Sequence, residues 1–281
     1  MKRLLTAAVG IPVLLAVIKI GPAWLWFVVV ALCAALATRE ACALLRRPGR
    51  RPLTALAMTA SVLLASPLLL ARTLAVEPER GAGAGAAILF GLPLMLALVA
   101  TVLASALTRD SMEEMVDTAM TTLFPVMFVG LPSGFLTGLR VAAEDETGRD
   151  LVILLLVVVW VGDTAAYYGG SLLGRHPLSP RISPRKTVEG AVAGLAGGVG
   201  AAILAHYWWF RALPLPHAIA IGLVLGAVGI GGDLAESILK RAAGSKDSSS
   251  MLPGHGGMLD RIDSLLFAGP ALYYYYLIVL R

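Results

Sequence analysis

Charged residues and cysteines are both scarce in this sequence of 281 residues. Only 15% of the residues are charged and 58% are hydrophobic, whereas soluble domains have about 25% charged and about 45–50% apolar residues. The two cysteines, Cys33 and Cys42, lie in or beside an apolar stretch and lack metal-ligand spacing, so neither a disulfide framework nor a zinc site is expected. We predict a polytopic membrane protein in which both cysteines are small core residues.

Several familiar functional patterns are also missing. No A-x-A-like cleavage site follows the basic and apolar start, so we expect residues 4–20 to be a retained span and not a signal peptide. The net charge is +5, but the basic residues are spread over short loops without interleaved aromatics, which argues against a nucleic-acid partner. His176, His206 and His217 have no partners at metal spacing, and we interpret them as structural.

What the sequence has in abundance is long apolar stretches. The hydrocarbon core of a bilayer takes about 20 residues of helix, and nine stretches fit, over residues 4–20, 22–38, 53–75, 86–107, 120–140, 151–170, 188–207, 217–235 and 265–280. With the N-terminus in the cytoplasm, most Lys and Arg residues fall on the cytoplasmic side, in agreement with the positive-inside rule. We predict an all-α polytopic integral membrane protein with about nine transmembrane helices, its N-terminus inside and its C-terminus outside.

Polar residues concentrate in the second half of the chain. We therefore divide it into residues 1–150, whose helices serve packing and dimerisation, and residues 151–281, a catalytic region with its polar site at the cytoplasmic face. Glycines recur every four residues within two of the later spans, a pattern that suits close helix packing in lipid. These glycines are Gly190, Gly194 and Gly198 in one span and Gly222 and Gly226 in the next.

One carboxylate lies inside an apolar stretch, at "VWVGDTAAYYGG". An ionised carboxylate at the centre of a bilayer costs about 2.5–3.5 kcal/mol on insertion scales. Asp163 therefore needs either a bonding partner on a neighbouring helix or a water-filled cavity. We interpret it as part of a substrate cavity, because ionisable groups inside membranes commonly serve function.

The loop segment "RHPLSPRISPRKTVEG" is basic. We expect Ser183 and Pro184 to be the N-cap and the first residue of the helix over 188–207. Arg185 and Lys186 would then lie in its first turn, against the helix dipole, an arrangement that suits a bound phosphate. A basic anchor at lipid headgroups is the alternative, and this segment by itself does not separate the two.

Carboxylates gather between the last two spans, in "GGDLAESILKRAAGSKDSSS" and the following "PGHGGMLDRID". A helix that begins at Leu259 would project Asp260 and Asp263 side by side. Together with Asp233 they are hard oxygen ligands of the kind that Mg²⁺ takes beside substrate phosphates. The sequence therefore predicts a magnesium site built by Asp233, Asp260 and Asp263.

Basic side chains accompany these carboxylates. Lys240, Arg241, Lys246 and Arg261 would offset phosphate charge, as phosphoryl transfer requires. Ser237 can share a helix face with Lys240. His255 lies between two glycines, where it could be a metal ligand, a general base, a nucleotide contact or a hydrogen-bonding turn residue.

The contiguous run "SILKRAAGSKDSSSMLPGHGGMLDRID", from Ser237 to Asp263, resembles the signature of the phosphatidate cytidylyltransferases, also called CDP-diacylglycerol synthases. Its Ser-x-x-Lys-Arg, Lys-Asp, His-Gly-Gly and Asp-Arg-x-Asp elements have the family's spacing. "GDTAAYYGG" and "SPRKTVEG" look like the family's supporting motifs, whereas residues 1 to about 150 resemble it only in hydropathy.

The resemblance implies transfer of a cytidylyl group from CTP to phosphatidic acid, with release of pyrophosphate, by a membrane enzyme that is usually a homodimer. It implies Mg²⁺, with a monovalent cation such as K⁺ nearby. We expect the protein in the inner (cytoplasmic) membrane of the cell, with the site facing the cytoplasm as the distribution of Lys and Arg indicates. Carried over by residue, Lys240, Arg241, Lys246 and Asp247 would handle phosphate and nucleotide, and Ser183, Lys186 and Thr187 would contact substrate.

Two other kinds of function stay open at this point. A secondary transporter also has intramembrane charges and glycine-interrupted helices, although the charges here gather at one face and no internal repeat is evident. A cytidylyltransferase that acts on another lipid phosphate is the nearer alternative, because recognition of acyl chains is spread over many apolar contacts. A purely structural scaffold leaves the polar cluster unexplained.

Overall fold

The computed structural model describes residues 2–47, 51–73, 82–143, 145–249, 251 and 256–281. Within these residues the helices are α1 (Lys2–Lys19), α2 (Ala23–Leu45), α3 (Thr54–Ala65), α4 (Pro67–Thr73), α5 (Ala82–Thr108), α6 (Met112–Pro125), α7 (Leu131–Val141), α8 (Asp145–Leu173), α9 (Val188–Trp208), α10 (Leu215–Ala242) and α11 (Leu259–Tyr275). Short π-helical segments, Val126–Gly130 and Tyr276–Leu280, follow α6 and α11. Two strands, β1 (Pro177–Ser179) and β2 (Ser183–Thr187), form an antiparallel hairpin.

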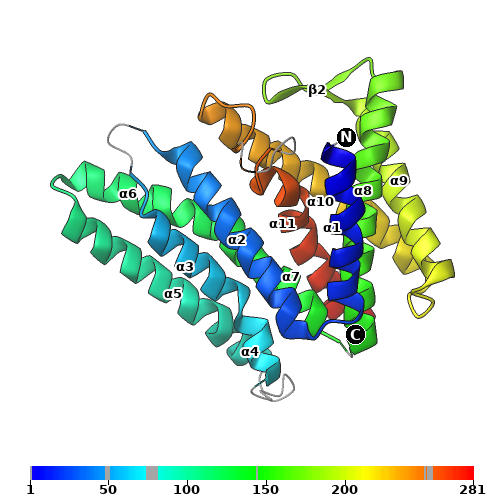
Figure 1. The fold of residues 1–281 in the computed structure, drawn as a ribbon, viewed down its shortest axis with the longest axis horizontal. Coiled ribbons are helices and arrows are strands. Elements are labelled where there is room, and N and C mark those ends of the chain that lie inside the picture. Colours follow the sequence, from blue (N-terminus) through cyan, green and yellow to red (C-terminus); the bar gives the residue numbers. More distant parts are fainter. Residues whose placement is uncertain (1, 48–50, 74–81, 144, 250, 252–255) are drawn as a thin grey trace.

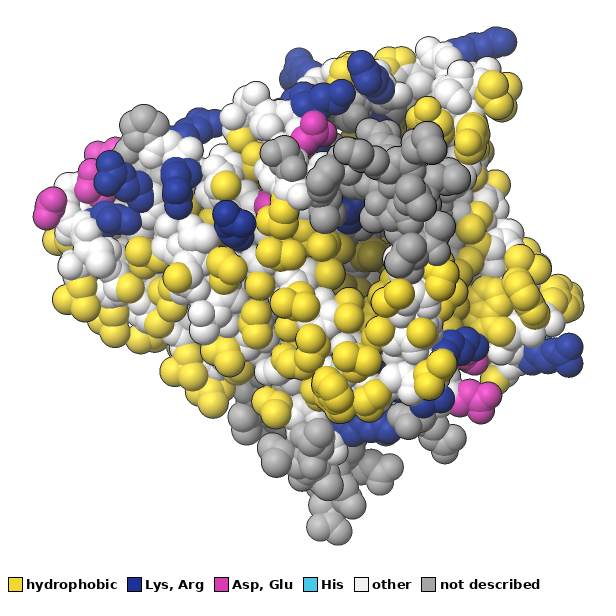
Figure 2. All heavy atoms as spheres, in the orientation of Figure 1, with side chains coloured by type: hydrophobic (Ala, Val, Ile, Leu, Met, Phe, Trp, Pro, Cys, Tyr) yellow, Lys and Arg dark blue, Asp and Glu magenta, His cyan; other side chains and the backbone are white. Residues whose placement is uncertain are grey.

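Eight helices in the described part of the chain are long and apolar enough to cross a membrane. They are Ala23–Leu45, Thr54–Arg72, Phe90–Thr108, Met112–Val141, Glu146–Leu173, Val188–Trp208, Leu215–Ala242 and Leu259–Leu280. Residues 4–20, which we predicted as a span, correspond to α1. The apolar part of α1 whose side chains are described, Gly10–Lys19, is shorter than the eight candidate spans. Figure 2 shows apolar side chains over the middle of the molecule and charged ones mainly near its two ends. The all-α polytopic membrane class is confirmed.

The helices form two groups that meet along α7 (Figure 1). α2, α3, α5 and α6 lie on one side and α8 to α11 on the other, and α7 packs against α2, α3, α8 and α11. The β1–β2 hairpin lies at the end of the bundle where α1 begins, and the C-terminus lies at the opposite end. The end of α10 and the start of α11 lie at the same end of the molecule as the hairpin.

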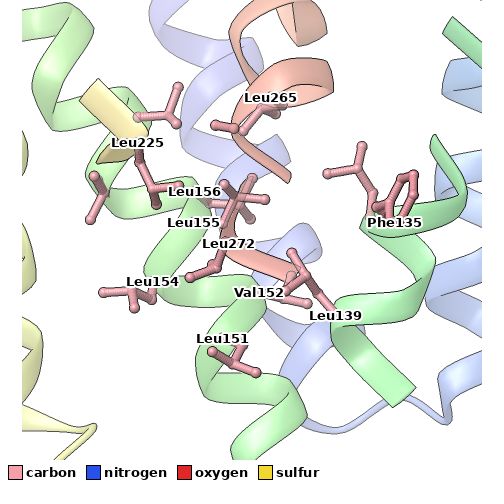
Figure 3. Close-up of a cluster of buried hydrophobic side chains, with 14 of the residues drawn as sticks. Phe135, Leu139, Leu151, Val152, Leu154, Leu155, Leu156, Leu225, Leu265 and Leu272 are labelled. Carbon is pink, nitrogen blue, oxygen red and sulfur yellow. The ribbon is translucent and has the colours of Figure 1, made fainter. Parts of the chain in front are cut away.

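The core is built on the start of α8. Leu151, Leu154 and Leu155 are almost completely buried, and they pack beside Leu139 of α7 and Leu272 of α11 (Figure 3). Helices in lipid associate through such van der Waals packing and through occasional polar contacts. This core holds α8, which carries Asp163 further along, in a fixed relation to α11.

The glycine spacing predicted close helix packing, and the structure confirms it. A Cβ added to Gly194 of α9 would lie 3.0 Å from the Cβ of Ala166 and 3.1 Å from the carbonyl oxygen of Gly162, both in α8. A Cβ added to Gly222 of α10 would lie 2.6 Å from the Cα of Val199 in α9. The backbones of α8, α9 and α10 therefore approach as closely as small residues allow.

One local prediction was wrong. Ser183 and Pro184 do not open a helix, because residues 183–187 form β2 and pair with β1 through Ser183 and Thr187. A residue before proline is pushed into extended backbone, which disfavours a helical turn at Ser183. The N-cap of α9 is Thr187, whose hydroxyl accepts a hydrogen bond from the amide of Gly190 at 3.1 Å. Arg185 and Lys186 thus precede the helix, and the argument from its dipole does not hold.

Candidate active site

A cavity of about 1180 Å³ opens between α8, α9, α10, α11 and the β1–β2 hairpin. Its charged lining residues are Asp163, Arg185, Lys186, Asp233, Lys240, Asp247, Asp260, Arg261 and Asp263. Apolar and small residues, including Ala166, Ala191 and Ile230, line it as well. Charges of both signs beside an apolar wall suit a ligand with a phosphate group at one end and a lipid at the other.

Three carboxylates converge beside this cavity, of which Asp233 and Asp263 line it and Glu236 is buried behind them. Among the described residues, three carboxylates each place one oxygen within 4.8 Å of the other two: Asp233, Glu236 and Asp263. Asp233 and Glu236 are one turn apart on α10, and Asp263 faces them from α11. Hard oxygen donors at this separation fit Mg²⁺, which usually takes one or two carboxylates and completes its octahedron with waters and substrate phosphates.

Lys240 connects the two helices that carry the carboxylates. Its ammonium pairs with Glu236 one turn earlier on α10 and lies 2.7 Å from Oδ1 of Asp260 on α11. The Glu236 side chain is completely buried and that of Asp260 is 10% exposed. A cation shared by two buried carboxylates offsets part of their repulsion and fixes α10 relative to α11.

Asp260 is held from several directions. Its Oδ2 accepts hydrogen bonds from the hydroxyl of Ser248 at 2.8 Å, the amide of Ser248 at 3.1 Å and the amide of Gly257 at 2.8 Å. Gly256 has a φ of +77°, and a Cβ there would lie 2.9 Å from the same oxygen. Glycine is therefore required both by the backbone conformation and by the close carboxylate.

The hairpin brings a second ammonium to the cavity. Lys186 of β2 forms an ion pair with Asp233 of α10, and its side chain is 24% exposed. The hairpin is tied to α9 because Glu189 accepts hydrogen bonds from the amides of Arg175 and His176, at 3.0 and 3.2 Å. The local fold thus positions Lys186 over the carboxylates, even though it does not lie in a helix.

The cavity gathers most of the residues that the sequence singled out, and their roles remain predictions. Asp163, Lys186, Thr187, Asp233, Lys240, Asp247, Asp260, Arg261 and Asp263 line it. Ser183, Ser237, Arg241 and Lys246 are not among its lining residues. Ser237 is buried in α10, and Arg241 donates instead to the carbonyl of Ile182 in the hairpin at 3.2 Å. His255 lies outside the described residues.

The other three histidines contact groups away from the cavity lining. His176 Nδ1 lies 2.5 Å from Glu189, His206 Nδ1 lies 2.6 Å from the carbonyl oxygen of Leu213, and His217 Nδ1 lies 2.9 Å from the hydroxyl of Tyr275. These contacts join the segment before β1 to α9, the end of α9 to the segment before α10, and the start of α10 to the end of α11. They agree with the structural interpretation of all three.

Two buried acidic residues that lie behind the cavity lining had no role assigned from the sequence. Glu236 joins Asp233 and Asp263, and its position three residues after Asp233 and four before Lys240 could have indicated it. Glu40 of α2 contacts Ser248, Ser249, Met258 and Leu259, more than 200 residues later in the chain. No local pattern in the sequence predicts that contact.

The chain is similar to several known proteins. The model of the cytidylyltransferase family matches residues 1–279. Among curated proteins, a phosphatidate cytidylyltransferase of Bacillus subtilis is 46% identical over 133 residues, which cover 46% of this chain and 48% of the relative. One of Synechocystis is 43% identical over 136 residues (48% and 45%), and one of Haemophilus influenzae is 38% identical over 151 (50% and 52%). The matched part spans about half the length of these relatives.

Proposed function

Because the chain belongs to the cytidylyltransferase family, we propose that it transfers a cytidylyl group from CTP to phosphatidic acid, giving CDP-diacylglycerol and pyrophosphate. The observation that carries this proposal is the pair of ammonium groups, Lys186 and Lys240, among the carboxylates of one cavity. The names of the three relatives support the choice of substrates.

The reaction requires one bond to form and one to break. An oxygen of the lipid phosphate attacks the α-phosphorus of CTP, and the bond from that phosphorus to the bridging oxygen of the β-phosphate breaks in line. Both substrates are already ionised, so no side chain needs to remove a proton from the nucleophile. The chain's contribution is to bring two anions together and to stabilise the charge that builds on the leaving pyrophosphate.

The basic side chains would bring the two anionic substrates together. Lys186 and Lys240 are both held by carboxylates, which keeps the ammonium groups at the cavity before any substrate arrives. Arg185 and Arg261 line the same space and would contact phosphate oxygens at its rim. Asp247 and Lys246 lie in the segment after α10 and are proposed to contact the nucleotide.

The carboxylates would hold a metal ion that stabilises the charge on the leaving pyrophosphate. Asp233, Glu236 and Asp263 form an oxygen donor set that fits Mg²⁺, and Asp260, which the sequence also assigned to the metal, lies beside them. When bound, Mg²⁺ would neutralise charge on the phosphates. A neighbouring monovalent cation such as K⁺ belongs to the same proposal. Asp163 lines the cavity from α8 and is proposed to help shape the space that the substrates occupy.

We further propose that this site faces the cytoplasm from a bacterial inner membrane, with the N-terminus inside and the C-terminus outside. The positive-inside distribution of Lys and Arg supports this orientation, and soluble CTP could then reach the cavity directly. The apolar wall formed by Ala166, Ala191 and Ile230 would leave the acyl chains in lipid. A homodimer packed through the region 1–150 is part of the same proposal.

A direct assay tests the reaction. Purified protein in detergent is incubated with CTP labelled at the α-phosphate, Mg²⁺ and a panel of lipid phosphates that includes diacyl, ether-linked and prenyl species. We expect labelled CDP-diacylglycerol and an equal amount of pyrophosphate with phosphatidic acid. Product with only a different lipid phosphate would change the substrate, and absence of any CDP-lipid would overturn the proposed function.

A further inference from the structure

Glu40 is a buried carboxylate in the first half of the chain. It lies near the end of α2 and is 3% exposed. Three groups donate hydrogen bonds to it: the hydroxyl of Ser249 at 2.6 Å and the amide of Met258 at 3.0 Å on Oε1, and the amide of Leu259 at 2.8 Å on Oε2. A fourth donor, the hydroxyl of Ser248, lies 3.0 Å from Oε2 and shares its single hydrogen between Glu40 and Asp260. Such a carboxylate is stable in the interior because its oxygens are satisfied.

Two of these donors belong to the beginning of α11. The first amides of a helix have no partner within the helix and are usually capped by a nearby side chain. Met258, at the N-cap position of α11, makes no such side-chain hydrogen bond. Instead, Glu40 on α2 accepts hydrogen bonds from the amides of Met258 and Leu259 and so caps α11 from another helix. A negative charge at a helix N-terminus is favourable. The position of α2 therefore fixes where α11 begins.

The other two donors belong to the segment that holds Asp260. The Ser248 hydroxyl lies between the two carboxylates, 3.0 Å from Oε2 of Glu40 and 2.8 Å from Oδ2 of Asp260. Ser249 lines the cavity. At Gly257 an added Cβ would overlap both the Ser248 hydroxyl and the Glu40 carboxylate. Among the described residues, the hydrogen bonds of the Glu40 carboxylate thus go to residues 248–249 and to residues 258–259, at the start of the helix that carries Asp260 and Asp263.

We propose that Glu40 is a positioning residue for the reaction at this cavity. It fixes the first turn of α11, which sets the direction of Asp260 toward Lys240 and of Asp263 toward Asp233, and it holds Ser248 and Ser249 against the same turn. This inference rests on the proposed function. It also gives residues 1–150 a part in the active site, although every side chain that lines the cavity comes from residues 163–264.

The test compares two variants of α2 that each remove a buried polar contact. Glu40→Gln keeps the size of the side chain, but its amide group points hydrogens at a backbone amide of Met258 or Leu259. Thr38→Val is the matched control, because Thr38 is completely buried and its hydroxyl bonds Ser61 of α3 at 2.9 Å, away from the cavity. We measure kcat and KM for the monodisperse fraction of each variant from size-exclusion chromatography, and we normalise the rates to the amount of protein in that fraction.

We expect kcat of Glu40→Gln to fall about 10- to 100-fold, since a displacement of about 1 Å at reacting groups costs as much, while KM for CTP changes less than about threefold. Thr38→Val is expected to keep kcat while losing thermal stability. A Glu40→Gln enzyme with wild-type kcat, or a Thr38→Val enzyme with an equal loss of kcat, would assign Glu40 to general stability and overturn the proposal.

A double-mutant cycle with Ser249→Ala tests whether the effect passes through the contact described. If Glu40 acts through this segment, Glu40→Gln combined with Ser249→Ala is only slightly slower than Glu40→Gln alone. Multiplicative losses would contradict the route.

Hydrogen exchange separates this inference from the reaction itself. The amides of residues 258–263 are expected to exchange faster in Glu40→Gln than in the wild type and in Thr38→Val. If the wild type makes no CDP-lipid, the proposed function fails, yet faster exchange still supports the positioning of α11. Unchanged exchange overturns that positioning whatever the assay gives.

Discussion

Lys240 lies 2.7 Å from Asp260 and also pairs with Glu236, so one ammonium joins the last turns of α10 to the first turn of α11. Removing that charge would leave two largely buried carboxylates without their shared cation. Lys240→Met keeps most of the side-chain volume and should therefore isolate the loss of charge.

We expect Lys240→Met to lower kcat about 100- to 1000-fold, as the loss of one preorganised electrostatic group does in other enzymes. We also expect a loss of stability of about 3–5 kcal/mol, the usual cost of removing one partner of a buried ion pair. Product formation and thermal unfolding in detergent measure the two effects. Arg211→Ala, an exposed change after α9, is the control, and equal behaviour of the two variants would contradict the role of Lys240.

Lys186 makes its contribution from the hairpin. Lys186→Ala should raise the KM for CTP or phosphatidic acid about tenfold or more, because one charged contact to phosphate is lost. Its partner Asp233 would also lose its ion pair. Arg181→Ala, in the exposed turn between β1 and β2, should leave both KM values unchanged. If Lys186→Ala has wild-type KM and kcat, the residue is a membrane-surface anchor and not a substrate contact.

Gly257 is confined by Ser248 and Glu40, and its amide donates to Asp260 at 2.8 Å. Gly257→Ala should push these groups apart and lower kcat more than about tenfold. The yield of folded protein should stay close to that of the wild type. Gly231→Ala is the matched control, because a Cβ added there meets nothing within 4 Å. Comparable activity of the two alanine variants would show that the tight packing around Gly257 has no bearing on the reaction.

The close approach of α9 and α10 offers a test of the fold. Gly222→Leu would force side-chain atoms into the backbone of α9 at Val199, whereas Gly200→Leu on α9 enters open space. We expect the first variant to unfold at a clearly lower temperature in detergent and the second to resemble the wild type. Equal melting temperatures would mean that α9 and α10 are not packed as described.

The sequence predicts well those features that depend on local spacing. Apolar lengths located the spans, and the four-residue glycine repeats indicated close packing of the helices that became α9 and α10. Helical spacing from Leu259 correctly brought Asp260 and Asp263 onto one helix start. The hairpin was missed because Ser183-Pro184 is also typical of a helix N-terminus. Glu40 was missed for a different reason, since its partners lie more than 200 residues away and only the packing of α2 against α11 brings them together.

The choice of carboxylates for the proposed metal site gives the most discriminating prediction. The sequence assigned Asp233, Asp260 and Asp263, whereas the oxygens that converge are those of Asp233, Glu236 and Asp263. Asp260 is occupied by Lys240, Ser248 and Gly257. A ligand and a positioning residue affect Mg²⁺ dependence differently, because only the loss of a ligand weakens the binding of the ion itself.

We therefore expect Asp233→Asn, Glu236→Gln and Asp263→Asn each to raise the Mg²⁺ concentration for half-maximal activity by about tenfold or more. Asp260→Asn should lower kcat strongly at any Mg²⁺ concentration while leaving the half-maximal concentration near that of the wild type. Titrating activity with Mg²⁺ after treatment with a chelator measures both quantities. A large shift for Asp260→Asn with none for Glu236→Gln would return the metal site to the set of three aspartates, because binding would then follow the sequence spacing and not the convergence of Glu236 with its neighbours.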